Sequence, residues 1–165
     1  MYFDLVNQLA RNFQNIELWL DKAESFANEK RISVDVLLHA RLAPDMREFI
    51  YQVTSASDYV KGGAALLSGS DVPKYEDNET TLAEVRERIR KTVAFVESIP
   101  EEKFQGAGDR IVKAWGKNMK ADIYLRQILI PNAFFHITAA YAILRNQGVD
   151  VGKLDFVGFI EFLPA

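Results

Sequence analysis

The residue best suited to chemistry in this chain is a single imidazole, His136, which lies in the apolar stretch PNAFFHITAAYAILRNQG (131–148). If this stretch is helical, Asn132 lies one turn before His136 and on the same face. Such an imidazole can act as a general acid/base, ligate a metal, or be a buried histidine whose ring nitrogens bond to neighbouring polar groups. The sequence leaves these three roles open.

A metal centre at His136 would need partners, because a catalytic zinc or nickel site normally takes three protein ligands. The amides of Asn132 and Gln52 are weak ligands, whereas Asp45 and Glu48 are carboxylates on the same helical edge as Gln52. The H-E-x-x-H and E-x-x-H patterns of zinc and di-iron helices are absent. We therefore expect no metal; if one binds, the expected ligands are His136 with Glu48 or Asp45.

Composition and motifs exclude several other classes of protein. The 165 residues include no cysteine, which excludes disulfides and a cysteine nucleophile, and they contain no phosphate-binding glycine loop and no G-x-S-x-G motif. With 20 basic and 23 acidic residues, there is no basic excess to indicate nucleic acid or an anionic membrane as a partner. The N-terminus does not resemble a signal peptide, and the longest apolar run, 133–144, is too short to span a bilayer. We expect a cytoplasmic protein.

Hydrophobic periodicity predicts that long amphipathic helices position these residues. The expected helices are 2–29, a second from Pro44 to a stop at Gly69, a third from a Thr81/Glu84 capping box to just before Pro100, and 122–146 with a kink or restart at Pro131. Residues 104–120 are not helical in pattern, and 111–115 are expected to form one arm of a small hairpin that turns near 116–118. No linker divides the chain, so we predict one domain, 1–165, with an all-α, four-helix up-down bundle and a hairpin insert before the last helix.

Two other segments are expected to have structural rather than catalytic roles. The charges from 84 to 91 mix both signs and are expected to form a solvated helix face. The apolar tail, 154–163, places Phe156, Phe159 and Phe162 three residues apart. We expect this tail to dock on the bundle or on a second subunit.

The segment HITAAYAILRNQG (136–148) resembles the last helix of the DinB-like superfamily of four-helix metalloenzymes. The shared pattern is a histidine followed eight and nine residues later by Leu144 and Arg145, and then by Gly148. A wider set is similar to a family of unknown function in that superfamily: LLHARLAPDM (37–46), QVTSASDYVKGGAALLSG (52–69), FQGAGDR (104–110) and PNAFFH (131–136).

The resemblance implies a metal site made of three histidines, one on the second helix and an H-x-x-x-H pair on the fourth. His136 matches the second histidine of that pair, Asn132 stands in the place of the first, and the second-helix position falls near Gln52. Amides at two of three positions argue against the metal-dependent thiol-transfer or hydrolase chemistry that the superfamily implies. A polar pocket of Gln52, Asn132 and His136 that could bind a small molecule would remain. The resemblance also implies a homodimer.

Three functions follow as hypotheses. The favoured one is a non-catalytic, dimeric bundle with a degenerate, metal-free polar pocket for a small ligand and no cofactor. The second is a transferase or hydrolase in which His136 is a general acid/base or ligates zinc or nickel with help from Asp45 or Glu48. The third is a structural or interaction protein whose exposed tail, 156–163, drives assembly.

Overall fold

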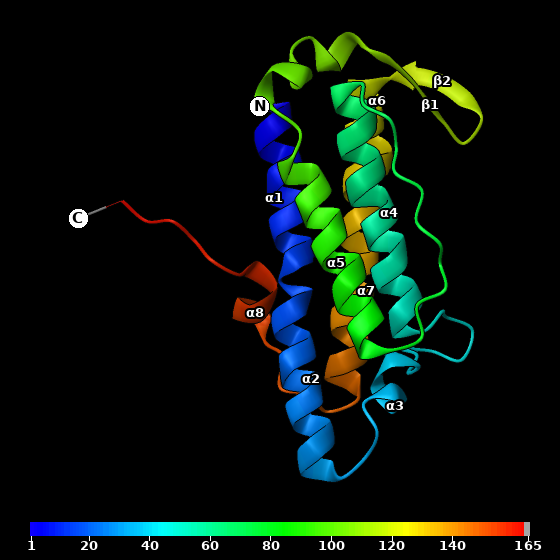
Figure 1. Ribbon diagram of the computed structural model, residues 1–165, viewed down its shortest axis with the longest axis vertical. Coiled ribbons are helices and arrows are strands. Elements are labelled where there is room, and N and C mark those ends of the chain that lie inside the picture. Colours follow the sequence, from blue (N-terminus) through cyan, green and yellow to red (C-terminus); the bar gives the residue numbers. More distant parts are fainter. Residues whose placement is uncertain (164–165) are drawn as a thin grey trace.

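The computed structural model describes residues 1–163, which are mostly helical and include a two-stranded hairpin (Figure 1). This agrees with the expected all-α class with a hairpin insert. The α-helices are α1 (Tyr2–Gln14), α2 (Ile16–Lys30), α3 (Asp35–Leu38), α4 (Phe49–Ser68), α5 (Leu82–Glu97), α6 (Ala121–Tyr124), α7 (Ile130–Asn146) and α8 (Lys153–Val157). The remaining elements are the 3₁₀ turns η1 (Glu101–Phe104) and η2 (Ala107–Asp109), the π turn η3 (Leu125–Leu129), and strands β1 (Ile111–Ala114) and β2 (Lys117–Lys120).

The helix expected over 2–29 is divided into α1 and α2 at Asn15. Asn15 keeps helical dihedral angles, so the two helices follow one another end to end (Figure 1). Its side-chain nitrogen donates to the carbonyl of Phe156, 3.0 Å away in the C-terminal segment. Asparagine is a weak helix former, and this long-range contact gives it a role that helical periodicity does not reveal.

The second long helix begins later than expected. Residues 40–48 are not helical, and α4 starts at Phe49 rather than at Pro44. The amide of Phe49 donates to the carbonyl of Ala40, which closes the non-helical segment into a loop. The predicted stop is confirmed, because Gly69 adopts a left-handed conformation (φ 72°) that glycine adopts without strain.

The start of α5 agrees with the sequence. The hydroxyl of Thr81 accepts a hydrogen bond from the backbone of Glu84, and the Glu84 carboxylate accepts one from the backbone of Thr81 at 2.9 Å. This reciprocal pair is the predicted capping box, and it satisfies two amides that lack partners within the helix.

The predicted up-down order of the helices is wrong, because α4 and α5 run in the same direction. Arg110, which follows η2, donates to the carbonyl of Leu67 near the end of α4. Phe104, just beyond α5, packs on Phe3 at the start of α1 with ring centroids 5.7 Å apart. Both helices therefore end where α1 begins (Figure 1). The 69–81 connection can extend over about 40 Å, which exceeds the length of about 30 Å of the 20-residue α4.

The last long helix is continuous from Ala121 to Asn146 but contains a π turn. Pro131 lies in the first turn of α7, where its missing N–H is tolerated, and η3 directly precedes it. By length and composition this 26-residue helix, with mean hydropathy 1.4 in its apolar window, could cross a membrane. The core helix of a bundle passes the same test, and 44% of that window is buried here.

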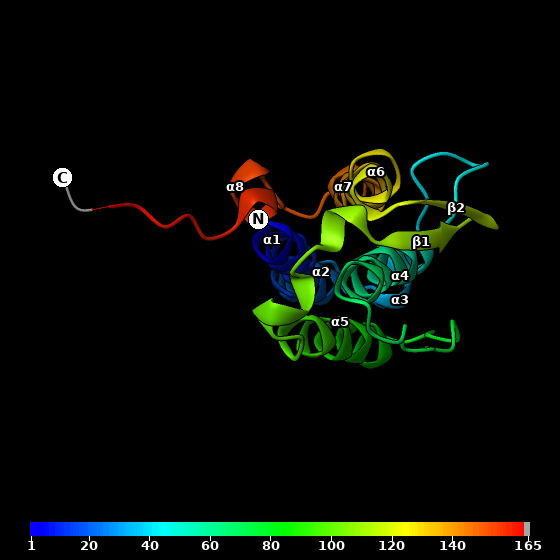
Figure 2. The same cartoon turned by 90° about the horizontal axis from the view of Figure 1, so that it is seen from above.

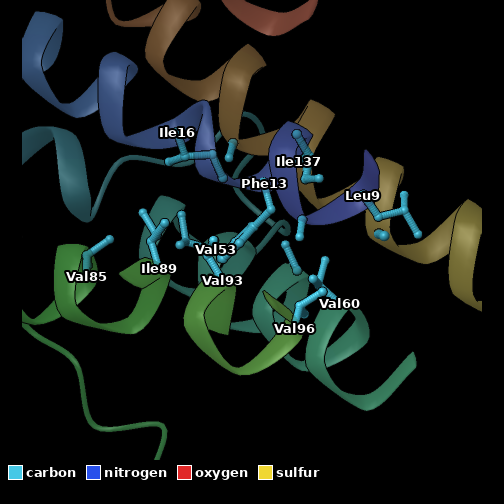
Figure 3. Packing of buried hydrophobic residues seen from close by; sticks show 14 of the residues in the cluster. Leu9, Phe13, Ile16, Val53, Val60, Val85, Ile89, Val93, Val96 and Ile137 are labelled. Atoms are coloured by element: carbon cyan, nitrogen blue, oxygen red, sulfur yellow. The ribbon is translucent and has the colours of Figure 1, made fainter. Parts of the chain in front are cut away.

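The hydrophobic core lies between the long helices, which are seen end-on in Figure 2. Phe13 of α1, Val53 of α4, Val93 of α5 and Ile137 of α7 converge in it (Figure 3). The periodic apolar residues from which the helices were predicted supply the side chains of this core. Small residues let α4 and the last helix approach closely, since a Cβ at Gly63 would collide with Leu129.

Candidate functional site

The centre of the candidate site is a hydrogen bond between α4 and α7. Nδ1 of His136 lies 2.8 Å from Oε1 of Gln52, across 84 residues of sequence. The Gln52 side chain is buried, and its nitrogen donates to the carbonyl of Arg47 at 3.0 Å. That carbonyl can only accept, so it fixes the orientation of the amide and turns Oε1 toward the imidazole.

This arrangement defines the protonation of His136. Because Oε1 of Gln52 can only accept, Nδ1 of His136 must carry the proton. Burial lowers the pKa of His136 below its ordinary value of 6.5, so the imidazole is neutral at pH 7. Nε2 is then an unprotonated nitrogen, able to accept a hydrogen bond.

Aromatic rings surround the imidazole. Tyr59 stacks on it at 5.7 Å, while Tyr51 and Phe135 meet it edge-on at 6.2 and 5.2 Å. Burial raises the pKa of Tyr59. Burial and the nearby Tyr59 raise the pKa of Tyr124 to about 12. Both phenols therefore stay neutral at pH 7, and no charge competes with the imidazole from this side.

The other residues singled out in the sequence point elsewhere. Asn132 donates to the carbonyl of Ile128 at 2.7 Å, one turn back on its own helix. Glu48 lies 3.2 Å from Nδ1 of His39, and Asp45 is exposed. The structure thus brings Gln52 and His136 together and gives Asn132, Glu48 and Asp45 other surroundings.

The residues present do not fit the metal that the superfamily implies. His136 offers one nitrogen, while both ends of the Gln52 amide are engaged by His136 and by the Arg47 carbonyl. Within residues 1–163, no three His, Cys, Asp or Glu side chains gather closely enough to hold a metal ion. This donor set is far from the three ligands of a catalytic zinc centre.

Two cavities of the described molecule flank the histidine. One, of about 390 Å³, is lined by Tyr51 and lies between α4 and the 77–79 segment. The other, of about 400 Å³, is an apolar groove lined by Phe134, Phe135 and Thr138 of α7 and by residues before α4. His136 lines neither cavity, but its ring contacts Tyr51, which lines the first, and Phe135, which lines the second.

A second polar cluster, centred on Arg88 of α5, was missed in the sequence. Its side chain is fully buried, so the expected solvated face is wrong at this position. The guanidinium donates to the hydroxyl of Ser57 at 2.7 Å and to the carboxylates of Asp58, Asp77 and Glu79 at 2.7, 3.0 and 2.9 Å. Burial alone would lower the pKa of Arg88, but these carboxylates reverse the effect and raise it.

One sequence signal could have found this cluster. Arg88 lies three residues after Val85 and four before Thr92, within the buried stripe of α5 rather than opposite it. The inner face of α4 carries Ser57, which bonds to Thr92 at 2.7 Å. Polar residues on two facing apolar stripes indicate a buried polar network.

Comparison with known proteins defines the class of this chain. It is similar to the crystal structure, at 1.83 Å resolution, of a DinB family member protein from Shewanella denitrificans, with 40% identity and a TM-score of 0.94 over 99% of this chain and 95% of that one. No match is found among curated proteins. The fold is thus that of the DinB-like helical proteins. Residues 1–157 match the family described as "Domain of unknown function (DUF1993)", and the chain belongs to that family.

Proposed function

We propose that this protein is a non-catalytic bundle that binds a small molecule through His136. The observation that carries the proposal is the Nδ1–Oε1 bond to Gln52, which fixes the imidazole and leaves Nε2 as an acceptor. A half-buried acceptor among aromatic rings suits a ligand with one O–H or N–H donor and an apolar body.

The absence of a fitting ligand set favours binding over metal-dependent hydrolysis or group transfer. A neutral imidazole could serve as a general base, but general-base catalysis also needs a bound nucleophile and a group that stabilises developing charge. The neighbours of His136 are a neutral amide and three aromatic rings. These groups orient a ligand and supply no charge for such a step.

The test is an NMR titration of the imidazole nitrogens with phenol and, separately, with anisole, which has the same ring but no O–H. We expect phenol to shift the Nε2 resonance of His136 saturably and anisole to leave it in place. The chain has two histidines, so a His39→Gln variant assigns the signals. Equal responses to the two compounds, or no saturable response to phenol, would remove the support for an acceptor site at Nε2.

We also propose a homodimer in which the C-terminal tail takes part. The start of the tail is held by the bundle, because Trp19 stacks on Phe156 at 5.8 Å and donates to the carbonyl of Asp155. Beyond it the chain extends away from the helices (Figure 1), and Phe159, Phe162 and Leu163 are 89%, 81% and 90% exposed. Exposed apolar side chains of this kind favour association.

Light scattering of a chain truncated after Gly158 tests the tail, because this truncation keeps Phe156 and α8 in place. We expect the full chain to be dimeric and the truncated chain to be monomeric. An unchanged mass after truncation would exclude a role of the tail in assembly.

A further inference from the structure

The apolar tail that follows α8 is not covered by its own bundle. Gly158 turns the chain out of α8 with φ 74°, a conformation that glycine adopts without strain, and a Cβ there would lie 2.4 Å from the Asn15 side chain. The surface of α1 beside the root of the tail is polar and includes Arg11. It leaves three large apolar side chains of the tail exposed to water, those of Phe159, Phe162 and Leu163.

The apolar groove on α7 is also uncovered. It has a volume of about 400 Å³ and lies between α7 and the loop of residues 40–48. Leu42 and Met46 line it on the loop side, and Phe134, Phe135 and Thr138 line it on the helix side. Phe135 is 58% exposed and Leu42 is 40% exposed. Apolar side chains that gather in this way on a surface mark a site of association.

The tail and the groove also match in charge. The tail carries a single charged side chain over residues 158–163, the exposed Glu161. The rim of the groove carries Arg41, whose Nη1 donates to the carbonyl of Met46 at 3.1 Å. No carboxylate of the described residues pairs with this guanidinium. An apolar segment with one carboxylate therefore complements an apolar groove with one cation at its rim.

We propose that the tail of one copy of this chain docks in the α7 groove of a second copy, and that the second tail docks in the first groove in return. The inference rests on the homodimer proposed above and names its contact surface. The tail with α8 lies on one side of α7 and the 40–48 loop lies on the other (Figure 2). A twofold axis parallel to the long helices therefore brings each tail to the groove of the other copy, and the assembly closes as a dimer.

The area of such a contact is large enough for a stable dimer. The apolar side chains of one tail are two phenylalanines, one isoleucine and one leucine, all of them exposed. Their burial removes about 500 Å² of surface from water. Two tails, together with the groove surface that they cover, therefore exceed the total of about 1,000 Å² that a specific interface needs.

Variants test the groove and the charge pair through the dissociation constant of the dimer. Thr138→Glu places a carboxylate in the groove beside the docked Glu161 and should raise this constant at least about tenfold. Ala94→Glu, at an exposed position of α5, is the matched control and should leave it unchanged. An unchanged constant in Thr138→Glu would contradict docking in this groove.

Charge reversal identifies the partner of Glu161. Arg41→Glu should weaken the dimer about tenfold, and adding Glu161→Arg to the same chain should restore most of the loss. Arg11→Glu is the control, because Arg11 lies beside the root of the tail in its own copy. Equal effects of Arg11→Glu and Arg41→Glu, or no recovery in the double variant, would contradict the assignment.

The decisive experiment is intermolecular paramagnetic broadening, which the absence of natural cysteines makes possible. A spin label is attached to Leu163→Cys, and this chain is equilibrated with ¹⁵N-labelled wild type, so that broadening reports only contacts between copies. We expect the amide signals of Leu42, Met46 and Thr138 to be lost, and a label on Ser25→Cys, at an exposed position of α2, to leave them intact. A dimeric mass without broadening at the groove would refute the docking and leave the homodimer standing, whereas a monomeric mass in light scattering would refute both.

Discussion

Replacing Arg88 by methionine is expected to destabilise the protein strongly. The Arg88 side chain is fully buried, and its removal leaves Glu79, whose side chain is 5% exposed, as an uncompensated buried charge. Breaking a buried ion pair by deleting one partner costs about 3–5 kcal/mol. Asp58 and Asp77 are 44% and 61% exposed, so water can solvate them, and the loss of their ion pairs with Arg88 adds little to the cost. We therefore expect the free energy of unfolding to fall by about 3–5 kcal/mol.

Urea denaturation followed by circular dichroism measures this change. For a chain of this size the melting temperature should fall by on the order of 10 °C. Arg90→Met is the matched control, because Arg90 lies on the same helix but is 63% exposed, and its loss should cost less than about 0.5 kcal/mol. A double variant, Arg88→Met with Glu79→Leu, should recover part of the loss, since the orphaned charge is gone. A loss below about 1 kcal/mol in Arg88→Met would show that this network contributes no more than a surface pair.

The remaining predictions concern the histidine and a helix cap. His136→Leu should lower the free energy of unfolding by about 1–3 kcal/mol, because Oε1 of Gln52 loses its donor; in urea titrations the double variant with Gln52→Leu should cost less than the sum, and additivity would refute the coupling. Burial lowers the pKa of His136, so the stabilising effect of the neutral imidazole is complete above pH 6.5 and is lost as the pH falls through the pKa of the folded protein. Wild type should therefore lose more stability than His136→Gln between about pH 7.5 and 5.5. Equal losses in the two proteins would contradict this. Thr81→Ala should cost about 1 kcal/mol in thermal melts by removing the cap of α5, and an unchanged melt would refute that role.

Local signals in the sequence predicted the elements whose causes are themselves local. The Thr81/Glu84 capping box, the stop at Gly69 and the hairpin of 111–120 all depend on residues within a few positions of one another. The direction of α5 could not be obtained in this way. It depends on whether the 69–81 connection turns back at once or runs along α4, and both are compatible with its polar composition.

The candidate site, too, was predictable from the sequence only where its features depend on local spacing. Gln52 and His136 lie on the facing sides of two predicted helices, so their pairing follows from helix periodicity. Asn132 is on the same face as His136 by spacing, but its amide satisfies the carbonyl of Ile128. The burial of Arg88 depends partly on the 77–79 segment, which covers the end of its side chain with Asp77 and Glu79. A loop contact of this kind has no sequence periodicity. The composition of α5 alone therefore predicted that Arg88 is exposed to solvent.

Elemental analysis of protein purified without a metal-affinity tag tests the central claim most directly, namely that His136 is a metal-free hydrogen-bonding residue. The geometry around Gln52 and His136 predicts zinc, nickel and iron well below one equivalent per chain, with no difference between wild type and His136→Ala. One equivalent of any of these metals in wild type, lost in His136→Ala, would contradict the account.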